Sequence, residues 1–173
     1  MTDVTAPQGA TLAADSFKAA FREHPAGVAV ITASTPSGPV GLTASSVASV
    51  AVDPMTLSFS VTRATGSAGA LLEAGVVVVH LLAAHHVALA DAFARSGQPR
   101  FTPEQQWSSF ETGEPLLPDA RAALRCRIVT VLPVGSSSLV VAEVLEVRLG
   151  PPAAPLIYHD RTFRQLDETP IEL

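Results

Sequence analysis

The sequence of 173 residues contains few of the residues that form cross-links or bind polyanions. Cys126 is the only cysteine, which excludes an intramolecular disulfide and a zinc site built from several cysteines. Charged residues make up 16% of the chain, the net charge is -5, and lysine and arginine form no cluster, which argues against nucleic-acid binding. There is no uninterrupted apolar run of about 18 residues, so we expect no conventional membrane span. These features predict a cytoplasmic protein whose partners are neither nucleic acids nor membranes.

The apolar fraction of 47% indicates a well-buried globular chain, and its length fits a single domain. Residues 1–14 have neither the basic start nor the long apolar stretch of a secretory signal, and we predict a mobile leader there. The predicted domain spans residues 15–173. Its first element is a short helix capped by Asp15 or Ser16 and ended by Pro25.

Most of the remaining chain has the pattern of β-strands, with few helices. Strands are predicted at 28–33, in the segment after Gly41, and at 55–62, 76–82, 122–132, 139–149 and 155–158, and helices at 67–74 and 84–95. Strands and helices do not alternate regularly, so the pattern favours a mainly β, antiparallel barrel over a Rossmann fold. Residues 96–118, which include Trp107, are predicted to form a long functional or interfacial loop.

The segment GLTASSVASVAVDP (Gly41–Pro54) is the most informative part of the chain. It combines small hydroxyl residues with β-forming residues, whereas the core of a sheet normally contains bulky side chains. Small side chains allow a ligand to approach the backbone, and hydroxyl groups provide hydrogen-bond donors. The segment therefore indicates a ligand site, although the residues alone also fit a solvent-facing edge strand.

Together with HPAGVAVITA (His24–Ala33) and VVVVHLLAAHHVALADAFA (Val76–Ala94), this segment resembles the flavin-reductase-like split-barrel family. The resemblance extends from about Phe17 to about Leu166 and is strongest to the reductase components of two-component flavin monooxygenases. It implies a single-domain split β-barrel that binds FMN or FAD. The implied activity is reduction of that flavin by NADH or NADPH and its release to a separate monooxygenase. The family resemblance also implies a homodimer that completes its flavin pocket across a two-fold interface.

The resemblance assigns residues to the flavin at several points along the chain. The segment after Gly41 is expected to contact the ring edge and the ribityl chain. The end of the strand at 55–62 and the turn after it are expected to bind the phosphate, and Arg95 is a second phosphate candidate. The implied flavin-binding residues are Thr43, Ala44, Ser45, Ser46, Ser60, Val61, Thr62, Arg63, Thr65, Ser67, His80, Phe93 and Arg95. From the residues alone, 62–67 also fits a plain surface turn, and His80 fits a core histidine.

The segment PVGSSSLVV (Pro133–Val141) departs from the family pattern. Ser136 and Ser137 stand where flavin-reducing relatives place Asp and His, and the His is associated with nicotinamide binding. A hydroxyl group replaces neither the stacking surface nor the charge of an imidazole. The resemblance implies that Ser137, Tyr158 and His159 bind the nicotinamide. Because of this departure, a flavin carrier with weak or no reductase activity is an alternative function. A split-barrel module that binds haem or a deazaflavin is a further alternative.

No catalytic side chain is assigned, because the flavin and the nicotinamide supply the reactivity. No metal site is predicted either. His85 and His86 are neighbours that would point about 100° apart on a helix, and we expect them to be solvated. The apolar strands and the loop at 96–118 with Trp107 are expected to provide the surface of a dimer.

Overall fold

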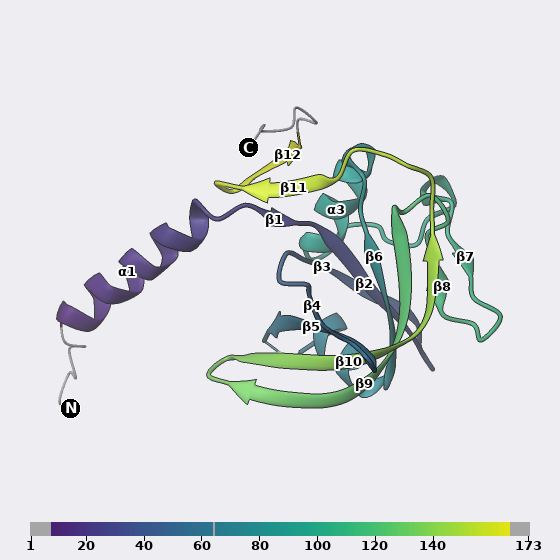
Figure 1. Cartoon of the computed structure of the whole chain (residues 1–173), viewed down its shortest axis with the longest axis horizontal. Helices are drawn as coiled ribbons and strands as arrows, with labels where there is room; N and C mark the ends of the chain where they lie inside the picture. The colour runs from purple at the N-terminus through teal and green to yellow at the C-terminus, as the bar shows by residue number, and fades with distance from the viewer. Residues whose placement is uncertain (1–7, 64, 167–173) are drawn as a thin grey trace.

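A seven-stranded antiparallel sheet forms the body of the protein, and the computed structural model describes residues 8–63 and 65–166. The strands follow the order β3-β2-β6-β9-β10-β5-β4 (Figure 1). Their bounds are β2 Ala29–Thr35, β3 Gly38–Ala44, β4 Ala48–Val52, β5 Met55–Thr62, β6 Val76–Leu81, β9 Ala122–Val134 and β10 Ser137–Leu149. The two longest, β9 and β10, form a ribbon that extends beyond the neighbouring strands.

Smaller elements lie around this sheet. The helices are α1 Gln8–Arg22, α2 Ser67–Glu73 and α3 Val87–Ala94, with 3-10 turns η1 Ala84–His86 and η2 Pro103–Gln105. The strands β1 Ala26–Gly27, β11 Leu156–His159 and β12 Thr162–Gln165 form a three-stranded sheet, and β7 Ser108–Ser109 pairs with β8 Pro115–Leu116. None of the helices in the described ranges is long and apolar enough to span a membrane. The predicted mainly β, antiparallel, single-domain fold is confirmed.

Strand β6 shows how the sequence produces the core. It begins with four consecutive valines, whose β-branched side chains favour extended backbone, and it lies between β2 and β9. Val77 and Val79 enter the main hydrophobic cluster with Phe59 and Leu71. Val78 points to the opposite face and packs in a cluster with Phe110 and Leu116. Both faces are covered, as the continuous apolar run predicts.

The structure differs from the local predictions in three places. The first helix begins at Gln8 rather than at Asp15 or Ser16, so residues 8–14 of the predicted leader are helical, while 1–7 lie outside the described residues. The helix predicted at 84–95 is a 3-10 turn followed by α3. The loop at 96–118 directs its aromatic side chains into the chain's own core, since Trp107 packs on Phe93 at 5.6 Å between ring centroids. It does not expose the dimer surface expected there.

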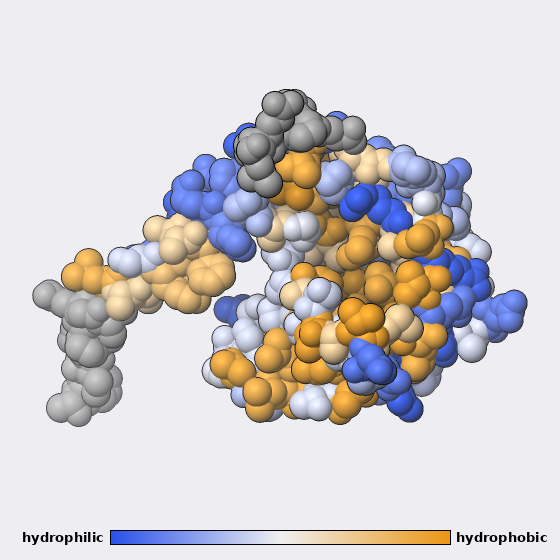
Figure 2. Space-filling model, in the orientation of Figure 1, coloured by the Kyte–Doolittle hydropathy of each residue, from blue (hydrophilic) through white to orange (hydrophobic). Residues whose placement is uncertain are grey.

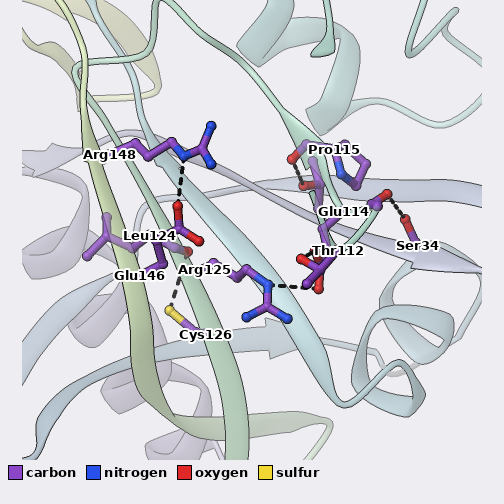
Figure 3. A network of polar contacts seen from close by, with 11 residues as sticks. Ser34, Thr112, Glu114, Pro115, Leu124, Arg125, Cys126, Glu146 and Arg148 are labelled. Carbon is purple, nitrogen blue, oxygen red and sulfur yellow. Dashed lines mark hydrogen bonds and ion pairs between the residues drawn. The ribbon is translucent and has the colours of Figure 1, made fainter. Parts of the chain in front are cut away.

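An ion pair fixes the distal part of this loop to the sheet. Glu114 is buried, and Arg125 of β9 donates a hydrogen bond to its carboxylate at 2.9 Å (Figure 3). Thr112 donates a second, shorter hydrogen bond to the same side chain. Burial alone would raise the pKa of Glu114, but the hydrogen bonds from Thr112 and Arg125 outweigh it and lower the pKa. The carboxylate therefore stays charged and holds the loop over the outer face of β6.

Candidate functional site

A groove lies where β3 and β5 meet, and most of the residues assigned to the flavin line it. We call it the hydroxyl groove, because small hydroxyl residues dominate its walls. Its volume of about 600 Å³ falls within the range of small-molecule sites. It is lined by Leu42, Thr43, Ala44, Ser45, Ser46, Ser60, Val61, Thr62, Arg63, Thr65, Gly66, Ser67, Ala68, Phe93, Ala94, Ser96 and Arg100. Of the residues assigned to the flavin, only His80 and Arg95 lie outside it.

Two of the hydroxyl groups in the groove hold the fold together. Ser46 accepts a hydrogen bond from the backbone N–H of Ser60 at 2.9 Å and donates one to the Ser60 carbonyl at 3.2 Å. These bonds join the chain after β3 to β5, although β3 and β5 are not neighbours in the sheet. Thr43 donates to the carbonyl of Ala90 at 2.6 Å and fixes α3 against β3. Ser45 is exposed, and within the described residues its side chain has no hydrogen bond.

Phe93 forms one wall of the hydroxyl groove by packing closely on β3. Its ring reaches Gly41, where a Cβ atom would lie 2.7 Å from the nearest ring carbon. Glycine is therefore required at this position, because a side chain would displace the ring. This contact explains the first residue of the hydroxyl-rich segment, which the sequence pattern alone does not.

Arg63 lies at one end of the hydroxyl groove in a left-handed backbone conformation, with a φ of 54°. Its N–H donates to the carbonyl of Ser136 at 2.9 Å, and its own carbonyl accepts from the N–H of Thr65 at 2.7 Å. The side chain is exposed and, within the described residues, makes no ion pair. Backbone strain of this kind at a non-glycine residue is typical of binding sites.

Arg100 is a second cation in the hydroxyl groove, and sequence reasoning missed it. Its guanidinium donates to the carbonyls of Gly41 at 2.9 Å, Ala92 at 3.2 Å and Arg95 at 2.7 Å, and to the hydroxyl of Ser67 at 3.3 Å. Burial lowers its pKa. No carboxylate in the described part of the chain pairs with it. The groove therefore contains a positive charge that is balanced only by carbonyl and hydroxyl dipoles, which favours an anion.

Arg95 and His80, both assigned to the flavin, lie elsewhere. Arg95 forms an exposed ion pair with Asp91 at 2.8 Å. His80 is fully buried, with Nδ1 3.2 Å from the carbonyl of Val30 and its ring edge-on to Trp107 at 5.3 Å. Burial lowers its pKa to about 4. His80 is thus a neutral core residue outside the groove, as the alternative interpretation of the sequence had it.

A second groove, about 870 Å³ in volume, lies under α1 and is called the α1 groove here. It shares Ser45, Ser46 and Ser60 with the hydroxyl groove, so the two are continuous. Tyr158, implied at the nicotinamide, lines the α1 groove, but His159 and Ser137 do not. Ser137 pairs with Thr62 near the Arg63 end of the hydroxyl groove. The structure therefore does not bring the three implied nicotinamide residues together.

His85, His86 and Asp119 form a cluster outside both grooves. The Nε2 atoms of the two histidines lie 3.3 and 3.1 Å from one oxygen of Asp119, and their rings are 4.0 Å apart. The expectation that both histidines are solvated is wrong for His86, which is buried. Nδ1 of His86 accepts a hydrogen bond from the N–H of Ala83 at 3.1 Å. The neutral ring then carries its proton on Nε2, which suits a hydrogen bond to Asp119 rather than a metal ion.

The hydroxyl groove can bind a planar, anionic ligand but offers little chemistry of its own. Arg63 and Arg100 provide positive charge, and backbone and hydroxyl groups surround the remaining surface. No carboxylate, histidine or cysteine is among its described lining residues. A reaction in this groove therefore depends on the reactivity of the bound molecules rather than on a protein acid or base.

Comparison with known proteins identifies the family of the chain. Residues 21–167 match the flavin reductase like domain. An NADH:FMN oxidoreductase of Rhodococcus qingshengii is 40% identical over 156 residues, covering 88% of this chain and 81% of the relative.

Two solved structures share the fold. A flavin reductase domain protein of Arthrobacter sp. FB24 has 34% identity and a TM-score of 0.85, covering 92% of this chain and 99% of that chain. The styrene monooxygenase flavin reductase of Pseudomonas putida S12 has 25% identity and a TM-score of 0.77, covering 91% of this chain and 99% of that chain. The architecture, the hydroxyl groove and these matches together place the chain in the flavin reductase like family.

Proposed function

We propose that this protein uses NADH to reduce FMN and releases the reduced flavin to a separate monooxygenase. The observation that carries the proposal is the hydroxyl groove, which combines small residues along its length with two cations, Arg63 and Arg100. FMN has the matching shape and charge, because it is a planar ring joined by a polyhydroxyl chain to a phosphate.

The phosphate of the flavin is bound at the Arg63 end of the hydroxyl groove. Arg63 and Arg100 supply the charge, and the hydroxyl groups of Thr65 and Ser67 add donors. Ser67 already accepts a hydrogen bond from Arg100 at 3.3 Å, which leaves its own proton free to reach a phosphate oxygen. This arrangement replaces Arg95, the second phosphate candidate from the sequence.

The isoalloxazine ring lies along Thr43, Ala44, Ser45 and Ser46, with Phe93 as an adjacent wall. The hydroxyl groups of Thr43 and Ser46 are engaged within the fold, so these two residues shape the groove while Ser45 and backbone groups contact the ring. Small side chains at these positions permit close approach of a flat molecule.

NADH and the flavin supply the chemistry, since hydride transfer between them requires no protein nucleophile. The chain binds both molecules, brings their rings together and excludes water from the contact. The α1 groove continues from the ring end of the hydroxyl groove through Ser45, Ser46 and Ser60, and it provides the space for the nicotinamide beside Tyr158.

The names of relatives support the choice of substrates and partner. The Rhodococcus relative is an NADH:FMN oxidoreductase, and the Pseudomonas structure is the reductase of a styrene monooxygenase. FAD remains a second substrate, as in the NADH:FAD oxidoreductase of Streptomyces globisporus. We also propose that the protein is a homodimer and that it is cytoplasmic. The cytoplasmic location is supported by the single cysteine, which is free and buried.

The test combines flavin titration with turnover. Ser45→Leu places a bulky side chain in the hydroxyl groove and should weaken FMN binding by ~2 kcal/mol, or about thirtyfold. Ser37→Leu, at an exposed turn between β2 and β3, is the matched control and should leave the affinity unchanged. Wild-type protein in catalytic amounts should consume NADH in proportion to added FMN. Equal FMN affinity in the two variants would place the flavin outside this groove.

A flavin carrier is the second candidate function, favoured by Ser136 and Ser137 in place of Asp and His. A carrier would bind FMN in the same groove and respond to Ser45→Leu in the same way. It would not consume NADH or NADPH, so the turnover measurement separates the two functions.

A further inference from the structure

The α1 groove is larger than a nicotinamide ring requires. Its volume is about 870 Å³, against about 600 Å³ for the hydroxyl groove, which takes a whole FMN in the proposed function. The nicotinamide is placed where the two grooves meet, and NADH also contains two ribose rings, a pyrophosphate and an adenine. The remainder of the α1 groove is therefore the nearest space for this adenylate half of the molecule.

Unpaired arginines gather in the two grooves. The chain has eleven lysine and arginine residues, and within the described residues six of them form no ion pair with a carboxylate. Four of these six line the grooves: Arg63 and Arg100 in the hydroxyl groove, and Arg22 and Arg161 in the α1 groove. The net charge of the chain is -5, so this arrangement does not follow from a general excess of positive charge. It predicts an anion in each groove.

Arg22 and Arg161 come together at the base of α1. The N–H of Asp160 donates to the carbonyl of Arg22 at 3.0 Å, so the turn between β11 and β12 is fixed against the end of the helix. Asp160 and Arg161 have φ values of 45° and 59°, and left-handed backbone at non-glycine residues is uncommon outside turns and binding sites. Figure 2 shows hydrophilic residues where α1 meets the body, beside the open gap that forms the groove.

The charged residues of the α1 groove favour an anion. Asp160 is the only carboxylate among its described lining residues. Lys18 adds a positive charge one turn before Arg22, although Asp15 pairs with it at 3.4 Å. Three cations against one carboxylate leave the lining with an excess of positive charge. An arginine fork suits a phosphate group, which can accept two parallel hydrogen bonds from it.

Aromatic rings lie beside these cations on the same helix. Phe17 and Phe21 line the α1 groove with ring centroids 4.7 Å apart, and they are 65% and 62% exposed. Helix α1 projects from the body of the protein (Figure 1), and every described side chain from Leu12 to Arg22 is exposed, so its own chain does not cover these rings. Aromatic rings next to cations form a surface on which a base can stack while its phosphates are bound.

We propose that the α1 groove binds the adenylate half of NADH, with Arg22 and Arg161 at the pyrophosphate and Phe17 and Phe21 at the adenine. This inference rests on the proposed function and adds the subsite that holds its second substrate. The phosphate of the flavin and the pyrophosphate of NADH then lie at opposite ends of one continuous cleft, and the two reacting rings meet at the serines that the grooves share. This separation reduces the repulsion between two anions that must be bound at once.

Removal of the two charges tests the subsite. Arg22→Gln with Arg161→Asn is the test variant, because asparagine tolerates the left-handed backbone at position 161. Arg127→Gln with Arg164→Asn is the matched control, since it removes the same charge from two exposed arginines outside both grooves. All four side chains are exposed, so both variants should keep the circular dichroism spectrum and the FMN affinity of the wild type.

Binding of ADP-ribose measures the subsite without turnover, because this molecule has the adenylate half of NADH but no nicotinamide. In isothermal titration calorimetry with FMN-loaded protein, the test variant should bind ADP-ribose about tenfold more weakly than the wild type and the control. The difference should shrink at high salt, since both arginines are exposed. Arg22→Lys with Arg161→Lys keeps the charges and should recover part of the affinity.

Steady-state reduction gives an independent readout. The test variant should raise the KM for NADH about tenfold and leave kcat nearly unchanged, because the pyrophosphate contact is the same in the ground state and the transition state. Dihydronicotinamide riboside lacks the phosphates and the adenine, so its KM should be equal in the wild type and the test variant. Phe17→Leu with Phe21→Leu removes the flat rings and should raise the KM for NADH about threefold, again without effect on the riboside.

Equal ADP-ribose affinity in the wild type and the test variant would overturn the proposal. A wild type that reduces FMN with NADH but does not bind ADP-ribose would overturn it as well, and in both cases the proposed reductase function would stand. A wild type that binds ADP-ribose through the two arginines but does not oxidise NADH would support the subsite and contradict the reductase function. Loss of turnover and loss of ADP-ribose binding are thus separate results.

Discussion

Arg63 lines the hydroxyl groove, whereas Arg95 lies outside it, so the two residues give a matched test of the phosphate contact. Arg63→Gln should weaken FMN about tenfold and riboflavin little, because only FMN carries a phosphate, and the difference should shrink at high salt since the side chain is exposed. Arg95→Gln is the matched control, as Arg95 is engaged by Asp91 outside the groove. Fluorescence titration with both flavins measures the effect. Equal losses of FMN and riboflavin in the Arg63 variant would reject the phosphate contact.

His80 makes stability depend on pH. Its pKa is about 4 in the folded protein because it is buried, against an ordinary value of 6.5. Between these values the unfolded chain takes up the proton first, so stability is complete above about pH 6.5 and falls as the pH is lowered toward 4, by about 3 kcal/mol in total. His86, whose pKa burial also lowers, adds to the trend.

The variant His80→Asn isolates this contribution. Urea unfolding at a series of pH values should show a shallower loss of stability between pH 6.5 and 4.5 for the variant than for the wild type. Glu114 acts below this window, since its lowered pKa makes its contribution disappear only at more acidic pH. Parallel pH curves for the two proteins would contradict the account of His80.

At the scale of elements, Ser46 joins β3 to β5 through two hydrogen bonds to the backbone of Ser60. Ser46→Ala removes both and should lower the free energy of unfolding by about 1 kcal/mol, a modest loss because water can reach the freed groups. Ser45→Ala, its neighbour without such bonds, is the control. Denaturant unfolding of the two variants gives the comparison, and equal stabilities would show that Ser46 does not close the barrel.

The β9–β10 hairpin carries the departure from the family pattern. Ser136 and Ser137 lie at its tip beside Arg63: the carbonyl of Ser136 accepts from the N–H of Arg63, and Ser137 pairs with Thr62. The family resemblance associates the Asp-His pair at this position with the nicotinamide, whereas the proposed function places the nicotinamide in the α1 groove. If the hairpin tip carries the contact, Ser136→Asp with Ser137→His should lower the apparent KM for NADH severalfold and leave FMN affinity unchanged.

Steady-state assays with varied NADH test this exchange. Ser108→Asp with Ser109→His makes the same change on exposed β7 and should have no effect. An unchanged KM in the hairpin variant would mean that this tip is not part of the nicotinamide site.

At the scale of the whole molecule, the sequence predicts local structure better than spatial arrangement. The bounds of β5 agree with its predicted range, and the valines of β6 identify a buried strand, because these signals lie within single segments. Most of the hydroxyl groove follows from one segment for the same reason. Arg100 lies in an irregular loop, and only folding brings it to Gly41, far away in the sequence.

The direction of α1 and the environment of His80 were equally inaccessible from sequence. Spacing identifies the apolar side of α1, but contacts at Arg22 and Asp160 decide where the helix points. From sequence, a histidine in an apolar strand can either contact a ligand or lie in the core. The structure buries both faces of β6, and His80 therefore lies in the core.

The most direct test of the central claim is anaerobic reduction of bound flavin. Protein loaded with one equivalent of FMN is mixed with one equivalent of NADH, and the visible absorption of oxidised flavin is followed, with Ser45→Leu for comparison. The account predicts complete bleaching by the wild type, since one hydride reduces one flavin, and slow or incomplete bleaching by the variant. FMN that binds the wild type but stays oxidised with excess NADH or NADPH would contradict the claim.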